Sequence, residues 1–208
     1  MPVAIFAIGP LSTNSYVINN ESEAAAIDVG GDPAPIIEYL RQKQLQLKAI
    51  CLTHLHFDHL YGVADLADAT KAVVYAPAGD APLLDTESST GGMWGMPIVK
   101  PFHSTPYPGA DFMLAGMKCE VIDTPGHTPG GVSLYFPSRS CVFTGDALFY
   151  RSLGRTDFPY GSHQTLLGSI KGKLFKLPDD TIVYPGHGPA TTIGEEKLEN
   201  PFLSEYDS

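Results

Sequence analysis

Residues 53–59 read Thr-His-Leu-His-Phe-Asp-His, so three of the seven histidines in this 208-residue chain, and one aspartate, fall within six positions. The cluster follows residues 49–52, an apolar run typical of a buried strand. Histidines two positions apart point to the same side of an extended chain, so His54 and His56 are expected to bind one ion. Asp58 and His59 follow at a turn, within reach of a second ion. Imidazole and carboxylate ligands suit zinc, with iron and manganese as alternatives.

Two coordination shells need further ligands, and a common pattern supplies three candidates downstream. In each case an apolar strand-like run is followed by Gly or Pro and then by a ligand-type residue. The three residues presented in this way are His127, Asp146 and His187. Pro and Gly restrict the backbone around His127 in the segment 124–130. A single histidine beside a strand is usually an ordinary polar residue, so the repetition of the pattern is what favours a metal site.

Taken in order, the HxHxDH cluster, the Gly-His turn, the Gly-Asp pair and the final Gly-His resemble the metallo-β-lactamase superfamily. The resemblance extends from Asn14 to about His187. It implies two divalent metal ions. One ion would be held by His54, His56 and His127. The other would be held by Asp58, His59 and His187, with Asp146 bridging the pair.

The patterning of the whole chain predicts an α/β fold. Strands are expected at residues 3–8, 14–18, 24–28, 49–52, 72–75, 117–122, 133–136, 140–144 and 181–183. Helices are expected at residues 35–43, 60–67 and 165–175. Two groups of strands with helices outside them predict a four-layer αββα sandwich, the fold of the family, with the metals along one edge. We expect residues 1–208 to form a single domain.

A site of this composition predicts hydrolysis. Water on divalent zinc has its pKa lowered to about 7, and the resulting metal-bound hydroxide attacks an ester, thioester, lactone or amide carbonyl. No Ser or Cys nucleophile is needed for this reaction. Asp58 and Asp146 are the predicted catalytic residues.

The short motif Gly-Arg-Thr-Asp-Phe at residues 154–158 narrows the expected substrate. It resembles a sequence shared by short bacterial glyoxalase II-like thioesterases and persulfide dioxygenases, and residues 184–202 resemble the former group. The resemblance implies a hydroxyacylglutathione hydrolase-like thioesterase acting on S-lactoylglutathione or a similar glutathione conjugate. Arg155 would bind a substrate carboxylate through two hydrogen bonds. The alternative is a structural pair of Arg155 with Asp157 beneath the metals.

The chain departs from longer glyoxalase II enzymes in two ways. Those enzymes carry a C-terminal helical domain that supplies much of the glutathione site, whereas 21 residues follow His187 here. Pro189 also replaces an aromatic residue of those enzymes. We therefore expect weaker or broader activity on glutathione thioesters. The alternative function is a persulfide dioxygenase, in which positions matching His54, His127 and Asp146 bind one iron.

Composition bounds the partners and the location of the protein. A formal net charge of −10 argues against a nucleic-acid partner and leaves a small-molecule substrate as the expected one. No apolar run is long enough to span a membrane, and the N-terminus lacks signal-peptide features, so cytoplasmic localisation is expected. The apolar surroundings of Cys51, Cys119 and Cys141 predict reduced core thiols.

Two histidines and one segment lie outside the predicted ligand set. His103, in a Pro-rich loop, and His163, at the start of a helix, are predicted to be surface or capping residues. Residues 76–108 carry several large apolar side chains, which either line a substrate pocket or cover the core. These are Met93, Trp94, Met96, Phe102 and Tyr107.

Overall fold

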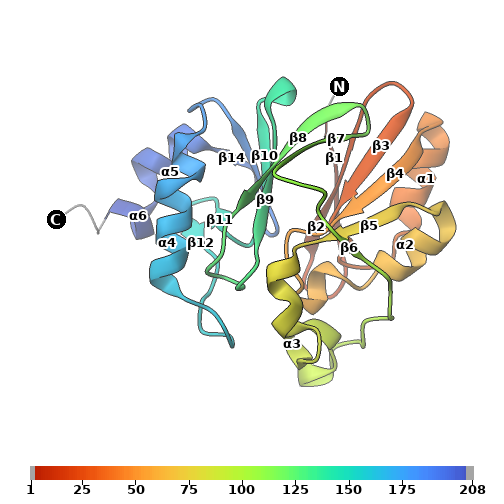
Figure 1. Ribbon diagram of the computed structural model, residues 1–208, viewed down its shortest axis with the longest axis horizontal. Coiled ribbons are helices and arrows are strands. Elements are labelled where there is room, and N and C mark those ends of the chain that lie inside the picture. Colours follow the sequence, from red (N-terminus) through yellow and green to blue (C-terminus); the bar gives the residue numbers. More distant parts are fainter. Residues whose placement is uncertain (1–2, 205–208) are drawn as a thin grey trace.

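The computed structural model describes residues 3–204, whose strands form two mixed six-stranded sheets and one short hairpin (Figure 1). The first sheet has the order β1 (Ala4–Ile8), β2 (Thr13–Asn19), β3 (Glu23–Ile27), β4 (Gln46–Cys51), β5 (Val73–Ala76) and β6 (Thr105–Pro106). The second has the order β14 (Thr191–Thr192), β13 (Ile182–Pro185), β10 (Cys141–Gly145), β9 (Val132–Phe136), β8 (Met117–Asp123) and β7 (Asp111–Leu114). The hairpin pairs β11 (Leu148–Phe149) with β12 (Ser152–Leu153). Residues 1, 2 and 205–208 of the predicted domain lie outside the described residues.

Helices cover the outer faces of both large sheets and complete the predicted αββα sandwich (Figure 1). Helices α1 (Ala34–Lys43) and α2 (Val63–Thr70) lie against the first sheet, and α4 (His163–Gly172) and α5 (Ile193–Glu199) lie against the second. The remaining helices are α3 (Glu87–Thr90) and α6 (Pro201–Ser204), with short 3-10 turns η1 (Phe57–His59), η2 (Ala78–Leu83), η3 (Met93–Gly95), η4 (Pro137–Arg139) and η5 (Leu174–Lys176). Within residues 3–204, no helix has the length and apolar character that crossing a membrane requires.

Three apolar cores separate the four layers, and strand periodicity explains how one strand serves two of them. In β4, Ala49 and Cys51 face the core between the sheets, whereas Ile50 and Leu52 face the core under α1 and α2. In β10, Cys141 and Phe143 face the core between the sheets, whereas Val142 faces the core under α4 and α5. A strand segment buried on both faces has apolar residues at successive positions, which is why residues 49–52 and 141–143 are continuous apolar runs.

The three cysteines are free and buried, as predicted. All three belong to the core between the sheets, and burial raises the pKa of each thiol. Thiols in such surroundings stay protonated at neutral pH and are poor nucleophiles. Chemistry at the metal centre therefore does not draw on cysteine.

Two predicted helices begin at different residues. The helix expected at 60–67 begins at Val63. Residues 57–59 form the turn η1, and the backbone just before Val63 forms hydrogen bonds outside the helix. Val29 N–H donates to the carbonyl of His59 at 3.0 Å, and Gly62 N–H donates to the carbonyl of Val29 at 2.9 Å. The helix expected at 165–175 begins at His163, where the Ser162 side chain caps it, and ends at Gly172.

Candidate metal centre

All seven predicted ligands follow the carboxyl ends of strands. The first four follow β4, His127 follows β8, Asp146 follows β10 and His187 follows β13. Backbone hydrogen bonds hold these loops together at one edge of the sandwich. Val132 N–H donates to the Thr53 carbonyl at 2.8 Å, and Gly186 N–H donates to the Gly145 carbonyl at 2.8 Å.

The structure brings the seven side chains together in three overlapping groups, in each of which the ligand atoms lie within 4.8 Å of one another. The groups are His54, His56 and His127; Asp58, His59 and His187; and His54, His59 and Asp146. The first two are the sets expected for the two ions. Asp146 joins one histidine from each set, the position expected of a bridging carboxylate. Clusters of this kind are typical of a dinuclear centre.

Short contacts between ligand atoms show how tightly the groups converge. The distance from His56 Nδ1 to His127 Nε2 is 2.8 Å, and that from His187 Nε2 to Asp58 Oδ2 is 3.1 Å. Asp146 Oδ1 lies 3.3 Å from His59 Nε2. This close packing also explains why residue 186 is a glycine, because a Cβ there would lie 2.1 Å from Asp146 Oδ1. Any side chain at that position would displace the carboxylate.

Hydrogen bonds behind the ligands fix the tautomer of three histidines. His127 Nδ1 donates to the Arg155 carbonyl at 2.7 Å, and His59 Nδ1 donates to Asp28 Oδ2 at 2.8 Å. Thr53 Oγ1 donates to Asp28 Oδ2 at 2.7 Å, so its oxygen accepts from His54 Nδ1 at 3.0 Å. With the proton on Nδ1, each ring in its neutral form presents the lone pair of Nε2 to the centre.

Asp28 is a functional residue that the sequence did not reveal. It is 2% exposed, and besides His59 and the Thr53 hydroxyl it accepts the Thr53 N–H at 2.8 Å. Its backbone φ of 52° is in the left-handed region, a strained conformation of the kind concentrated at functional sites. The only signal in the sequence was its place between a strand and the pair Gly30-Gly31.

Several buried atoms of the described ligands have no hydrogen-bond partner, which tests whether metal ions fit the centre. They include His54 Nε2, His59 Nε2 and Asp146 Oδ1. A buried polar atom without a partner is costly, and native proteins satisfy nearly all of them. The unpartnered nitrogens and oxygen converge on the same space, so divalent ions there would satisfy them.

The electrostatics around His54, His56 and Asp146 favour the protonation states that metal ligands need, whereas at His59 and His187 the effect of burial is outweighed by nearby carboxylates, which raise the pKa of both. Burial and the neighbouring histidines hold the pKa of His54 well below its usual range, and burial and His127 lower the pKa of His56 to about 3. Burial alone would raise the pKa of Asp146, but His59 outweighs it and the carboxyl pKa is well below its usual range. At neutral pH His54 and His56 are therefore neutral and the Asp146 carboxylate is ionised.

A cavity of about 350 Å³ opens onto the centre. Its polar residues are His56, Asp58, Ser88, His127, Asp146, Arg155 and His187. Its apolar residues are Leu11, Phe57, Met93, Trp94, Phe149, Leu153 and Phe158. One wall thus comes from α3 and η3, which extend below the sandwich in Figure 1. A larger cavity of about 570 Å³ lies behind the His127 loop, and the residues described as lining it include no predicted ligand.

Of the large side chains in residues 76–108, some line the cavity and others pack against the core. Met93 and Trp94 line the cavity at the centre, and Trp94 is 71% exposed. Phe102 packs against the core under α1 and α2, and Tyr107 stacks on Tyr75. His103 and His163 are exposed and are not among the described ligand groups.

Arg155 lies at the mouth of this cavity. Its guanidinium forms two hydrogen bonds with Asp157, of 2.7 and 2.6 Å, and lies 4.1 Å from the centre of the Phe158 ring. The side chains of Arg155 and Asp157 are 56% and 68% exposed, so the pair is not buried beneath the ligands. An ion pair this exposed is weak, and its carboxylate can be exchanged for another.

Known proteins match this chain along nearly its whole length. The family model for the metallo-beta-lactamase superfamily matches residues 8–187. The hydroxyacylglutathione hydrolase GloC of Haemophilus influenzae is 35% identical over 209 residues, covering 98% of this chain and 99% of that protein. The BLEG-1 B3 metallo-beta-lactamase has a TM-score of 0.90 at 39% identity, covering 98% of this chain and 100% of that one. TTHA1623, solved in a di-iron-bound form, has a TM-score of 0.87 at 38% identity, covering 96% and 100%.

Proposed function

The chain belongs to the metallo-β-lactamase superfamily as a metal-dependent hydrolase, and from that premise we propose that it is a thioesterase of the glyoxalase II type. The proposed substrates are S-2-hydroxyacylglutathione thioesters such as S-lactoylglutathione. The observation that carries the proposal is the pair of ligand groups joined by Asp146, which lies close to His54 and His59 and lines an open cavity. The likeness to a hydroxyacylglutathione hydrolase over the full length supports the choice of substrate.

Each part of the site has a task in thioester hydrolysis. His54, His56, His127, Asp58, His59, His187 and Asp146 would hold two divalent ions. Such ions supply hydroxide at neutral pH and stabilise the negative charge that develops on an attacked carbonyl. The apolar walls, which include Phe149 and Trp94, exclude water and accept the acyl chain. Arg155 would bind a carboxylate of glutathione at the mouth.

Metal analysis combined with a substrate panel tests the proposal. We expect purified protein to contain near two metal ions per chain and to hydrolyse S-lactoylglutathione faster than a β-lactam or a simple oxygen ester. Zinc is the expected metal, and iron is measured alongside it because a relative at 38% identity was solved with two irons. A single iron with oxygen consumption on glutathione persulfide would establish the dioxygenase alternative instead. Preferential β-lactam hydrolysis would also contradict the thioester assignment.

Replacing Arg155 separates a role in substrate binding from a structural role. For Arg155→Ala we expect about 10-fold weaker binding of S-hexylglutathione. Hydrogen bonds to charged groups contribute about 1.5–3 kcal/mol, but Arg155 must give up its bonds to Asp157 to bind the ligand, which lowers the net gain in binding free energy. Binding is measured through the emission of Trp94, the single tryptophan of the chain, which lines the same cavity.

Asp157→Asn is the matched control, because it removes the charge that pairs with Arg155 and leaves the guanidinium in place. We expect this variant to bind S-hexylglutathione as tightly as the natural protein, or more tightly. Equal weakening by both substitutions would mean that the pair itself supports the loop, and the carboxylate-binding role would be lost.

A further inference from the structure

Asp80 is a buried carboxylate that the proposed chemistry does not use. It lies in η2 and is 0% exposed. Each of its oxygens accepts one backbone N–H: Oδ2 from Leu55 at 2.9 Å and Oδ1 from Gly130 at 2.6 Å. Both bonds are between groups far apart in the chain, so the side chain joins two loops rather than stabilising its own turn.

The two backbone N–H groups bound by Asp80 lie beside ligands of a single proposed ion. Leu55 lies between His54 and His56, and Gly130 lies three residues after His127. The other group is fastened by different contacts, since Asp28 holds His59 at 2.8 Å and Thr13 Oγ1 donates to Asp58 Oδ2 at 3.1 Å. Asp80 therefore holds the backbone beside the ligands of the first ion, and Asp58 and His59 have further supports of their own.

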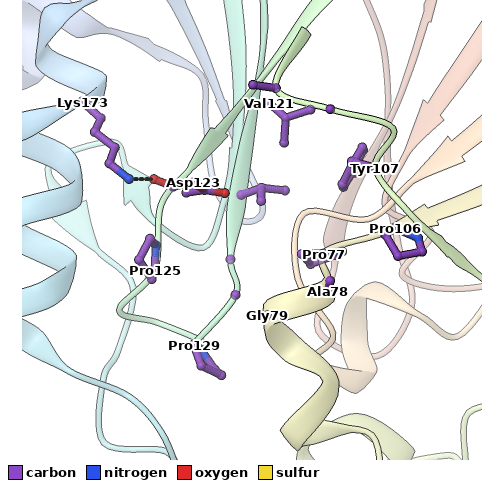
Figure 2. Close-up of a pocket in the computed structure, with 15 residues that line it drawn as sticks. Pro77, Ala78, Gly79, Pro106, Tyr107, Val121, Asp123, Pro125, Pro129 and Lys173 are labelled. Carbon is purple, nitrogen blue, oxygen red and sulfur yellow. Dashed lines mark hydrogen bonds between the residues drawn. The ribbon is translucent and has the colours of Figure 1, made fainter. Parts of the chain in front are cut away.

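The backbones of the two segments also touch directly. A Cβ on Gly130 would lie 2.3 Å from both Asp80 N and Gly79 C, and a Cβ on Gly79 would lie 2.7 Å from Gly130 Cα. Gly79, Pro129 and Gly130 all line the larger cavity, and Figure 2 shows Gly79 and Pro129 on facing segments. Only glycine permits the approach, which in turn brings Gly130 N–H within reach of the Asp80 carboxylate.

We propose that Asp80 is a positioning residue that holds the His54–His56 loop against the His127 loop, so that three nitrogens are in place before the ion binds. This inference rests on the metal-binding part of the proposed function and is independent of the substrate. Preorganised ligands bind a metal more tightly because less order is lost on binding. The hydrogen bond from Val132 N–H to the Thr53 carbonyl also links the loops, so removing Asp80 weakens the arrangement without abolishing it.

Two substitutions that break the same link in different ways test the proposal. Asp80→Asn keeps the size of the side chain but turns an NH₂ group toward a backbone N–H, and Gly130→Ala forces the segments apart. For both variants we expect about 10-fold weaker binding of one of the two zinc ions and unchanged binding of the other. A loss of about 10-fold is the lower end of the range observed when residues that support metal ligands are replaced. Stepwise competition of zinc-loaded protein with a chelator gives both affinities.

Matched controls separate this effect from a general loss of stability. Glu196→Gln alters another fully buried carboxylate, whose hydrogen bonds go to Arg151, Thr191 and Asn200. Gly168→Ala adds a Cβ in α4 where no heavy atom lies within 4 Å. Both controls should keep both zinc affinities. A lower melting temperature in Asp80→Asn or Gly130→Ala with unchanged zinc affinities would overturn the positioning role.

Hydrogen exchange in the natural protein tests the same proposal without any variant. The amides of Leu55 and Gly130 should exchange slowly after the zinc has been removed, because the link exists before the ion binds. Fast exchange of both amides in the metal-free protein would refute it. Since neither measurement uses a thioester, failure of this inference is distinguishable from failure of the proposed activity.

Discussion

The Asp146→Ala protein is expected to lose both metal ions together and to hydrolyse S-lactoylglutathione more than about 100-fold more slowly. Among residues 3–204, Asp146 is the carboxylate with close contacts to histidines of both groups, at 3.3 Å from His59 Nε2, 3.6 Å from His127 Nε2 and 3.7 Å from His187 Nε2. Without it, no anion lies between the two sets of nitrogens. Even residues one step behind metal ligands cost about 10–100-fold when replaced, so a shared ligand should cost more.

Metal content by mass spectrometry and kcat/KM measure this effect. Asp68→Ala is the control, because Asp68 is exposed on α2 and its replacement removes one carboxylate away from the metal centre. It should retain both ions and full activity. If Asp146→Ala kept two ions and normal turnover, the bridging position given to Asp146 would be wrong.

The convergence of the ligands could be predicted from the sequence because each one carries a local signal, whereas their division between two ions is what the resemblance to the family implies. His54, His56 and their neighbours crowd one segment, and the other three each follow a strand and a Gly or Pro. The ends of neighbouring strands meet at one edge of a sheet, so seven separated residues imply one centre. The structure brings them together in the expected sets.

Asp28 and Asp80 could not be found in the same way. Their partners are distant in the chain, Thr53 and His59 for one and Leu55 and Gly130 for the other. A single aspartate after a strand or in a turn is usually a solvated residue, and only the tertiary fold shows that these two are buried. Residues that support ligands thus carry less sequence signal than the ligands themselves.

The same contrast holds for the fold. Strand segments buried on both faces, such as residues 49–52 and 141–143, are continuous apolar runs and are recognisable by themselves. The sequence pattern does not predict the strand β7, because β7 is short and largely exposed. Its pairing with β8 defines it as a strand. The two-residue strands β6, β11, β12 and β14 were missed for the same reason, since their pairing partners, not their composition, define them.

Replacing Asp58 should remove one ion rather than two, which makes it the sharper test of a two-ion mechanism. Asp58 Oδ2 lies 3.1 Å from His187 Nε2 and 3.6 Å from His59 Nε2, within the second ligand group. The Asp58→Ala protein keeps His54, His56 and His127, so we expect near one ion per chain.

If hydrolysis uses both ions, the Asp58→Ala protein should lose more than about 100-fold in kcat/KM while holding its remaining ion as tightly as before. Added zinc in excess should restore little activity, because His59, His187 and the shared Asp146 are left to hold the second ion without its own carboxylate. Asp146→Ala and Asp68→Ala, assayed in parallel, give the expected limits of no bound ions and two. A protein with one ion and unchanged turnover would show that the first group alone carries the reaction, and the second would then have a structural role only.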